Sequence, residues 1–393
     1  MKIRMAGAAV ATLALVAAAG AATPKWNLLP AVPLPAGASS SQLQGVTVVS
    51  PQDVWTAGAW WDKTDVHPLM THWDGAGWKT ADLPALPHDT YLGGVDALGR
   101  SDVWAVGSTD TSVAASSPGA PSVLHYDGSS WQTVPTPAFP AATDNDLDGL
   151  DMRTPDDGWA VGETSSTTLT LPPPPKQPLI LHWQGGKWSG SAVPKSAVGS
   201  GGLVAVAAAS ADDVWAVGSR AGLSPVSRLT FGLVMHFDGS TWSAVNVPTP
   251  LGTSLNAVAV AGPGDVWAAG EICVSGCRGA VWHLTAGVWQ QVPTSAAADL
   301  LAVVAQAPDD VWVLGYSQLL SGDKADHVEH WDGKQFTAED TGLPPMTGTI
   351  GNNGELGSAT PIFAADNDAA SGELWAVGWS NPPSITPRVI HRG

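Results

Sequence analysis

The sequence predicts an all-β protein: a seven-bladed β-propeller with four antiparallel strands in each blade and a last blade that the N-terminal strand closes. Three observations lead to this prediction: a Trp motif recurs seven times, a strand ending in His follows each motif, and the two chain ends complement each other. The chain has 393 residues, 44% of them hydrophobic and 13% charged, which is enough apolar material for one large core. Beyond the first residues no helical apolar period is sustained, so a helical solenoid is disfavoured.

The recurring motif consists of an acidic residue, any residue, Trp, two small or apolar residues, and Gly. Its Trp residues are Trp55, Trp104, Trp159, Trp215, Trp267, Trp312 and Trp375. Its acidic residues are Asp53, Asp102, Asp157, Asp213, Asp265, Asp310 and Glu373, and its glycines are Gly58, Gly107, Gly162, Gly218, Gly270, Gly315 and Gly378. The motifs lie about 53 residues apart on average, a length typical of a four-stranded propeller blade.

A short strand of small residues is expected before each motif. The seven segments are residues 43–49, 92–98, 147–153, 203–209, 255–261, 301–307 and, less regularly, 362–365. Gly and Ala are frequent in them, and small residues suit strands that crowd around the axis of a propeller. We therefore expect this strand to be the innermost of each blade, with the Trp motif on the second strand.

A mostly apolar run that ends in His follows each motif and predicts the third strand. The seven residues are His72, His125, His182, His236, His283, His330 and His391. Six residues after each of the first six, an aromatic residue marks a short outer strand: Trp78, Trp131, Trp188, Trp242, Trp289 and Phe336. Each His belongs to a different blade, and strands lie about 4.8 Å apart, so the imidazoles are too widely spread to bind one metal ion. We expect each His to form a hydrogen bond with the acidic residue of its own blade.

The two ends of the chain predict how the ring closes. His391 lies two residues from the C-terminus, so the last blade lacks an outer strand of its own. Trp26 begins the run Trp-Asn-Leu-Leu-Pro, which resembles the outer strands that begin at Trp78 and Trp242. We therefore expect residues 24–34 to pair with the strand that ends at His391, which removes an open sheet edge.

The N-terminus predicts a secreted protein. Lys2 and Arg4 precede a short run rich in Ala, Leu and Val, and small residues follow it at 20–22. This pattern is typical of a secretory signal peptide, residues 1–22, and leaves residues 23–393 for the propeller; a retained membrane anchor is the alternative. The net charge of −18 disfavours nucleic acid and anionic membrane surfaces as partners. We expect an extracellular monomer.

The Gly-containing hairpins and the outer-strand Trp residues resemble those of the kelch and galactose-oxidase class of propellers. The run Asp-Val-Trp-Ala-Val-Gly, at residues 102–107 and 213–218, is also similar to repeats of uncharacterised secreted actinobacterial proteins. The resemblance covers nearly all of residues 23–393 and implies the propeller fold. It implies no activity, because most blades lack the kelch Gly-Gly doublet and no Tyr is followed by His, as a galactose-oxidase copper site would require.

Four aromatic residues shortly after the repeat Gly do not recur in every blade: Trp60, Trp61, Tyr316 and Trp379. They mark the start of loops between second and third strands, and Trp379 is expected near Trp60 and Trp61 because blades seven and one are neighbours. Exposed aromatic rings on one rim are typical of surfaces that stack on sugar rings or peptides. We interpret the four residues as ligand-binding, with packing of the loops as the alternative.

Cys273 and Cys277 are the only cysteines. Since the protein is predicted to be secreted, we expect them to form a disulfide. No further soft ligand lies nearby in the sequence, so a metal site at this pair is not predicted.

The acidic residues Asp144, Asp146 and Asp148 fit the first half of a calcium-binding loop. They also overlap the inner strand of the third blade, and Pro155 stands where such a loop carries Glu. We keep calcium as an alternative to a purely structural role and predict no other cofactor.

The sequence lacks the catalytic motifs of serine hydrolases and metalloproteases and the phosphate-binding loop. We therefore favour a secreted binding module over an enzyme, with a glycan, a cell-wall component, a peptide or an extracellular protein bound on the rim of variable loops. The alternative is an extracellular hydrolase or lyase whose carboxylate or His residues come from different blades and meet at the central channel. The acidic and basic side chains gathered in that channel distinguish the two interpretations.

Overall fold

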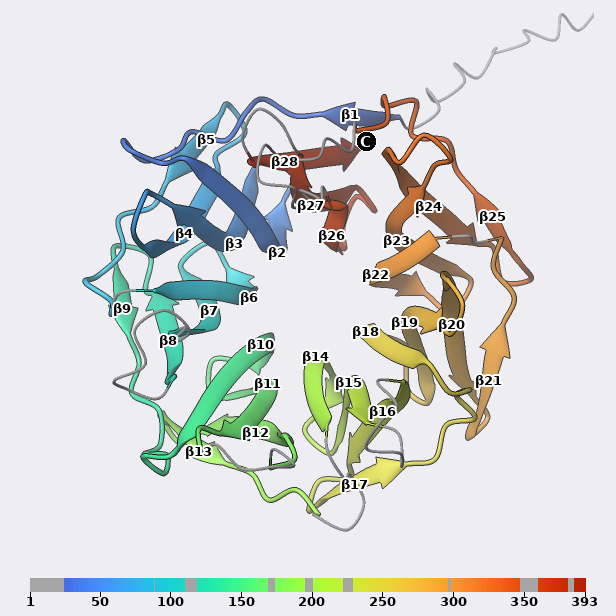
Figure 1. The fold of residues 1–393 in the computed structure, drawn as a ribbon, viewed down its shortest axis with the longest axis horizontal. Helices are drawn as coiled ribbons and strands as arrows, with labels where there is room; N and C mark the ends of the chain where they lie inside the picture. The colour runs from blue at the N-terminus through green and yellow to red at the C-terminus, as the bar shows by residue number, and fades with distance from the viewer. Residues whose placement is uncertain are drawn as a thin grey trace, which may run out of the picture.

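The fold is a ring of seven four-stranded antiparallel sheets around a central axis (Figure 1). The computed structural model describes residues 25–87, 89–109, 119–168, 174–194, 201–221, 229–295, 298–346, 360–380 and 385–393. Strands account for all the regular elements in these ranges, which confirms the all-β, seven-bladed prediction. The predicted signal peptide, residues 1–22, lies outside the described residues. No helix within the described ranges is long and apolar enough to cross a membrane.

Each blade runs from an inner to an outer strand in chain order, except the last. Blades 1 to 3 are β2 (Ser40–Ser50), β3 (Asp53–Trp61), β4 (Val66–Trp73), β5 (Trp78–Thr80); β6 (Thr90–Gly99), β7 (Asp102–Thr109), β8 (Pro121–Tyr126), β9 (Trp131–Thr133); and β10 (Thr143–Thr154), β11 (Asp157–Ser166), β12 (Gln177–Gln184), β13 (Lys187–Gly190). Blades 4 to 6 are β14 (Gly201–Ser210), β15 (Asp213–Ala221), β16 (Thr230–Phe237), β17 (Trp242–Val245); β18 (Thr253–Gly262), β19 (Asp265–Cys273), β20 (Cys277–Thr285), β21 (Val288–Val292); and β22 (Ala298–Ala307), β23 (Asp310–Gln318), β24 (Lys324–Trp331), β25 (Phe336–Ala338). Blade 7 combines β26 (Thr360–Asn367), β27 (Leu374–Ser380) and β28 (Thr386–Arg392) with β1 (Trp26–Leu28).

A bulge in each inner strand explains the Gly of the repeat. In blade 4 the register between β14 and β15 shifts between Leu203 and Ala205, opposite Gly218. A Cβ atom on Gly218 would lie 2.1 Å from the carbonyl oxygen of Gly202, which is far inside van der Waals contact. The same close approach recurs at all seven repeat glycines, so no other residue fits this position without moving the inner strand.

Every blade contains a unit of three side chains, which we call the acid–His–Trp unit. In each unit Nε2 of the His lies 2.6 to 2.9 Å from a carboxylate oxygen of the acidic residue on the second strand. The same imidazole lies against the ring of the motif Trp, with centroids 3.7 to 4.5 Å apart. The predicted hydrogen bond is therefore confirmed in all seven blades.

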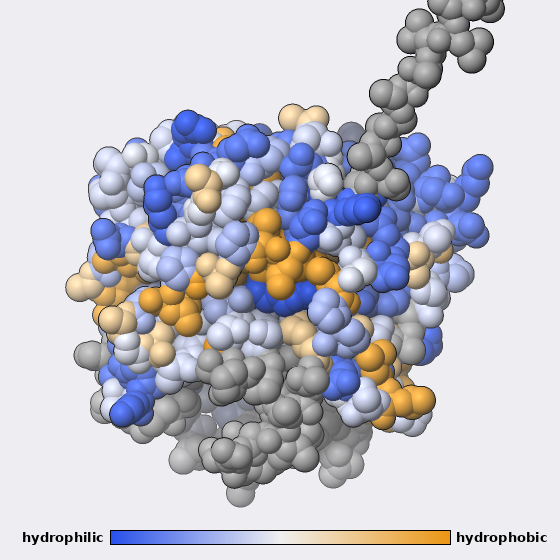
Figure 2. All heavy atoms as spheres, turned by 90° about the horizontal axis from the view of Figure 1, so that it is seen from above, coloured by the Kyte–Doolittle hydropathy of each residue, from blue (hydrophilic) through white to orange (hydrophobic). Residues whose placement is uncertain are grey.

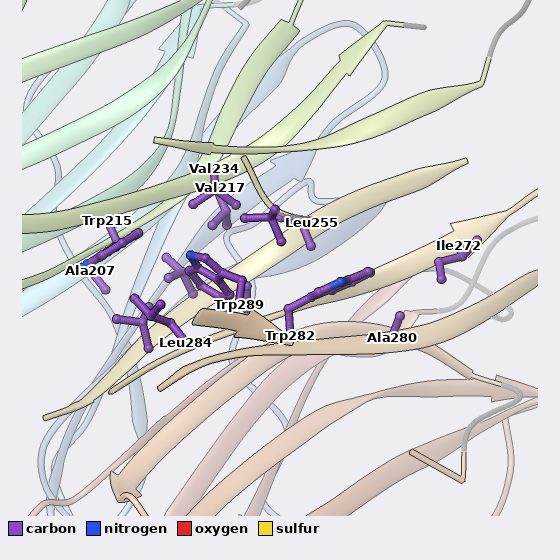
Figure 3. Packing of buried hydrophobic residues seen from close by; sticks show 14 residues of the cluster. Ala207, Trp215, Val217, Val234, Leu255, Ile272, Ala280, Trp282, Leu284 and Trp289 are labelled. Carbon is purple, nitrogen blue, oxygen red and sulfur yellow. The ribbon is translucent and has the colours of Figure 1, made fainter. Parts of the chain in front are cut away.

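The motif Trp residues fill the seams between blades and are only 0 to 6% exposed. Six of them pack against the outer-strand aromatic residue of the next blade, with centroids 5.2 to 6.5 Å apart. Figure 3 shows one such seam, where Trp215 of blade 4 and Trp289 of blade 5 share a cluster with Leu255. These edge-on contacts bury large apolar areas and favour a fixed geometry between neighbouring blades.

The N-terminal strand completes the seventh blade, as predicted. Trp26 pairs with Arg392 and Asn27 with His391, so β1 is the outer strand beside β28. The indole of Trp26 is buried and donates a hydrogen bond of 2.8 Å to Glu339 of blade 6, which also binds the guanidinium of Arg392 at 2.8 Å. Seen from the side on which β1 lies, hydrophobic residues form a patch within a largely polar edge, and Leu28 of β1 is 57% exposed (Figure 2).

Deleting residues 25–36 should strongly destabilise the ring. The deletion leaves β28 without its outer partner and removes the buried indole of Trp26, and loss of a buried Trp alone costs about 3 to 5 kcal/mol. Chemical unfolding monitored by Trp fluorescence measures the change. A matched variant that begins at residue 25 should keep the stability of the full chain. Equal midpoints for the deletion variant and this control would show that β1 does not close the ring.

Replacing His182 with Ala should lower the free energy of unfolding by roughly 1 to 3 kcal/mol, because the buried carboxylate of Asp157 loses one of its two side-chain partners and keeps only Arg153. The purified wild-type protein should hold no metal that depends on His182. Denaturant unfolding and elemental analysis of both proteins test the two statements. Stoichiometric metal that is lost in the variant would contradict the structural role.

Candidate functional site

A cavity of about 740 Å³ lies on the axis of the ring and is lined by the inner strands of all seven blades. Because the inner strands of blades 1 to 6 bulge after the Leu of the repeat, one residue of each bulge lines the cavity. These residues are Gln44, Gly93, Asp148, Val204, Asn256 and Leu301, with Phe363 near the irregular part of β26. The ring is therefore symmetric in backbone and strongly asymmetric in chemistry.

Aromatic side chains occupy one arc of the cavity wall. Trp61 at the end of β3, Tyr91 in β6 and Phe363 in β26 line it, together with Val66 at the start of β4. Their blades 7, 1 and 2 are consecutive in the ring, since β2 contacts both β26 and β6. One side of the cavity thus presents flat apolar surface.

A small number of polar side chains also line the cavity, both within the aromatic arc and outside it. Gln42, Gln44 and Asn256 supply amide groups, and Asn256 donates a hydrogen bond of 2.9 Å to the carbonyl of Leu300. Asp148 is the one carboxyl group among the described lining residues, which include no Lys, Arg or His. The wall therefore offers hydrogen bonds and at most one negative charge.

The carboxyl group of Asp148 has a pKa near neutral pH. Burial, together with the nearby carboxylates of Asp146 and Glu163, raises its pKa from 3.8 to about 7. Lys176, which is ion-paired with Glu163, partly opposes this shift. Near neutral pH Asp148 therefore exchanges between a hydrogen-bond donor and an acceptor.

Three more carboxyl groups connect the inner strands of neighbouring blades. Asp96, Asp151 and Asp366 occupy the same repeat position, directly opposite the motif Trp. Each accepts a hydrogen bond from a backbone N–H of the next blade, namely that of Met152 at 2.6 Å, Ala208 at 3.0 Å and Val48 at 2.8 Å.

Burial raises the pKa values of these three groups, to about 7 for Asp151 and Asp366. Repulsion from Asp96 adds to the shift of both. Part of each side chain is accessible to solvent, but the carboxylate lies against the backbone of the next blade, which leaves it poorly hydrated. Their hydrogen bonds to the backbone give them a structural role.

The four aromatic residues predicted as a ligand site do not form one exposed surface. Trp61 lines the cavity, whereas Trp60 stacks on His67 with centroids 4.1 Å apart and packs in the core between blades 7 and 1. Trp379 is only 8% exposed and lies 5.3 Å from the ring of Phe363. The expectation of exposure is therefore wrong for Trp379, because β27 is buried as far as this residue and its indole packs against Phe363.

Tyr316 belongs to a separate cluster between blades 5 and 6. Burial and a hydrogen bond with Asp299 raise the pKa of its phenol, and the ammonium of Lys324 lies 4.0 Å from its ring centroid. The pKa of Glu271 rises to about 7 through burial and its interaction with Asp299. Tyr316 does not line the axial cavity, so it and Trp61 are parts of different surfaces.

Asp144, Asp146 and Asp148 lie on β10 and not in a loop. Asp144 accepts the N–H of Gly119 at 2.8 Å, and Asp148 lines the cavity. Close groups of three metal-ligating side chains within the described ranges are Asp62, Asp65, His67 and Glu271, Cys273, Cys277. The two cysteines of the second group form the predicted disulfide.

Apart from Trp61 and Asp148, which the sequence singled out for other reasons, the residues of the cavity wall were not predicted, although a signal for them exists. The bulged residue directly follows the repeat Leu, as in Leu43-Gln44-Gly45 and Leu147-Asp148-Gly149. Comparing the residue after the repeat Leu across the blades would identify the side chains that line the axial cavity.

Comparison with known proteins supports the fold alone. No family model and no curated protein sequence matches this chain. A GH74 enzyme from Niastella koreensis is similar, with a TM-score of 0.52, 14% identity, and coverage of 90% of this chain and 54% of that chain. A PL25 ulvan lyase has a TM-score of 0.51, 8% identity, and coverage of 90% and 94%.

YCF48 from Cyanidioschyzon merolae has a TM-score of 0.49, 12% identity, and coverage of 93% of this chain and 98% of that chain. A second YCF48 structure is bound to D1 peptide. The likeness to the GH74 enzyme and the PL25 lyase supports the fold and says nothing of the chemistry of this chain.

The stability of the protein should fall as the pH rises from about 4 to about 7. The pKa of Asp366 is 3.8 in an unperturbed chain and about 7 in the folded protein, so the folded state binds the proton more tightly in this window. Below pH 4 the carboxyl group is protonated in both the folded and the unfolded state, so it does not lower the free energy of unfolding. Above pH 7 the free energy of unfolding is lowered by the full cost of ionising the buried group. Asp366→Asn should keep the hydrogen bond from the N–H of Val48. In this variant the fall in the free energy of unfolding between pH 4 and pH 7 should be smaller than in wild type by roughly 1 to 3 kcal/mol.

Denaturant unfolding at several pH values between 4 and 8 measures this effect in wild type and variant. Parallel curves for the two proteins would contradict the shifted pKa of Asp366.

Proposed function

We propose that the protein is an extracellular binding module that holds a neutral saccharide chain in the axial cavity. The observation that carries the proposal is the composition of the wall, which combines the aromatic residues Trp61, Tyr91 and Phe363 with amide side chains and one carboxyl group. Aromatic faces suit the apolar faces of sugar rings, and planar amides and carboxyl groups suit their hydroxyls. The volume of about 740 Å³ is in the range of ordinary ligand sites.

The charge of the wall favours neutral over acidic saccharides. An anionic sugar would meet Asp148, with no basic side chain among the described lining residues to offset its charge. The net charge of −18 adds repulsion at longer range. Cell-wall glycans built from neutral sugars or N-acetylated sugars fit this environment better than uronic-acid or sulfated polymers.

A binding role also fits the carboxyl groups better than hydrolysis does. Glycoside hydrolases use two carboxyl groups flanking the scissile bond, at separations of about 5 to 10 Å. Among the described residues Asp148 is the one carboxyl group that lines the cavity, and the carboxylates of Asp96, Asp151 and Asp366 are each engaged by a backbone N–H. A glycoside hydrolase would need a second free carboxyl group at the axis.

We place the protein outside the cytoplasm on two grounds. The N-terminal pattern at 1–22 is typical of a signal peptide. The disulfide between Cys273 and Cys277 suits an oxidising compartment.

Trp61→Ala should weaken saccharide binding by about tenfold or more, the loss expected when one buried aromatic anchor is removed. Calorimetric titration with oligomers of glucose, mannose and N-acetylglucosamine, and with oligogalacturonate as the acidic probe, measures the affinities. Tyr316→Ala is the matched control, because Tyr316 is a half-buried aromatic residue after a repeat Gly that does not line the cavity. The control should bind as wild type does.

Three outcomes would overturn the proposal. Preferential binding of oligogalacturonate would contradict the charge argument. Equal losses of saccharide affinity in Trp61→Ala and Tyr316→Ala would show that the saccharide does not bind in the axial cavity. Shortened oligomers after incubation with wild type, but not with Asp148→Asn, would favour the hydrolase or lyase.

A further inference from the structure

The third strand of blade 6 carries two side chains that depart from the repeat. His327 stands opposite the repeat Gly, and Glu329 directly precedes the repeat His. The residues opposite the repeat Gly in the other blades are Leu69, Ser122, Leu179, Leu233, Ala280 and Arg388. Those preceding the repeat His are Thr71, Leu124, Leu181, Met235, Trp282 and Ile390. Blade formation therefore requires neither an imidazole nor a carboxylate at these positions.

Ser317, His327 and Glu329 form a continuous hydrogen-bonded chain. The Oγ of Ser317 lies 3.1 Å from Nδ1 of His327, and Nε2 of that ring lies 2.8 Å from Oε1 of Glu329. The strand register places them on one face of the sheet, because Gly315 pairs with His327 and Val313 with Glu329. Gly315 has no side chain, which leaves room for the imidazole between Ser317 and Glu329.

The burial of Glu329 fixes the protonation state of this chain. Its side chain is 0% exposed, and burial alone would raise its pKa. Hydrogen bonds from His327 and from the backbone and hydroxyl of Ser295 outweigh this effect and lower the pKa, so the group is a carboxylate. A carboxylate only accepts hydrogen bonds, so Nε2 of His327 carries the proton and donates it. In the neutral ring Nδ1 then has a free lone pair, which can accept the hydroxyl proton of Ser317.

We propose that Ser317 is a nucleophile that accepts acyl groups from carboxylic esters. Its half-buried hydroxyl is hydrogen-bonded to an imidazole base, and Glu329 holds that base in one tautomer as a positioning residue. The roles match those of a Ser–His–acid triad with the two ring nitrogens exchanged, and such triads are recognised by geometry and role. The inference is independent of the axial cavity, to which none of the three residues belongs.

The reaction balances within these groups and the ester. Oγ of Ser317 forms a bond to the carbonyl carbon while its proton moves to Nδ1 of His327, and the imidazolium is stabilised by Glu329. The tetrahedral adduct then loses the alkoxide, which takes the proton from Nδ1 and leaves as an alcohol. Water repeats the sequence on the acyl-serine, releasing a carboxylic acid and restoring the hydroxyl of Ser317.

A recess borders the seam on which this chain lies. A cavity of about 340 Å³ is lined by Gly279 of blade 5 and by residues 291–294, directly before Ser295. A Cβ atom on Gly279 would lie 2.9 Å from the carbonyl of Ala298, which is the register partner of Ser317. The recess therefore lies in the same seam as the hydroxyl-bearing strand, although Ser317 itself is not among the residues that line it.

Blade 7 contains a matched control for the nucleophile. Ser380 occupies the position of Ser317, two residues after the repeat Gly, and its hydroxyl lies 2.8 Å from that of Thr386. Arg388 stands where blade 6 has His327. Ser380 thus has a hydroxyl partner and a similar strand environment but no imidazole base.

Covalent labelling of the folded full-length protein with a fluorophosphonate, mapped by mass spectrometry, tests the proposal. We expect Ser317 to react about 100-fold faster than Ser380, since a positioned general base contributes about 10²–10⁴ in rate. His327→Gln should remove most of this difference. Labelling of wild type should decline in acid, when His327 is protonated, and Glu329→Gln should move that decline to lower pH. Hydrolysis of p-nitrophenyl acetate should be lost in Ser317→Ala, which should still bind saccharide as wild type does.

Ser317 and Ser380 are compared within the wild-type protein, so this part of the test does not depend on whether a variant folds. Equal labelling of Ser317 and Ser380, or labelling of Ser317 that is independent of pH between 5 and 9, would overturn the proposal. Unchanged labelling in a folded His327→Gln protein would do the same.

Discussion

The acid–His–Trp unit is the contact on which the rest of the ring depends. Its hydrogen bond joins the second strand to the third, and the imidazole supports one face of the motif Trp. In four blades the indole also donates a hydrogen bond of 2.7 to 2.9 Å to the same acid. The Trp is thereby held in one orientation before it meets the next blade, so a polar contact inside a sheet determines the apolar contact between sheets.

Repetition frees individual positions for other chemistry. Because the unit, the bulge and the opposing Gly fix each blade, the residue exposed at a bulge can change without loss of the fold. Gln44, Asp148 and Leu301 are equivalent in backbone and share no chemical property. The same freedom allows blade 6 to hold a buried Glu329 where other blades are largely apolar. Function in this protein is therefore best sought in departures from the repeat.

The fold followed from the sequence because its signals are local and recur seven times. A Trp motif, a following His and an orphan Trp26 were sufficient to predict the blades, the polar unit and the closure by both ends. The axial site did not follow, because it depends on which side of a bulged strand faces the axis. Trp379 shows the limit clearly: departure from the repeat marked it as special, but only its packing against Phe363 reveals that its indole is buried.

Closure of the ring by the N-terminal strand determines when the fold can be completed during synthesis. The partners Trp26 and Arg392 are separated by almost the whole chain, so their pairing waits until the last residues have been synthesised. Until then blades 7 and 1 cannot pack together. The edge of β28 lacks its partner strand, and the Trp residues that the closed ring buries between these blades remain exposed. Contacts of such long sequence separation form slowly, since the loop entropy is lost before any contact compensates for it. Late closure suits the export that we propose, because the propeller would stay open until β1 and β28 are on the same side of the membrane.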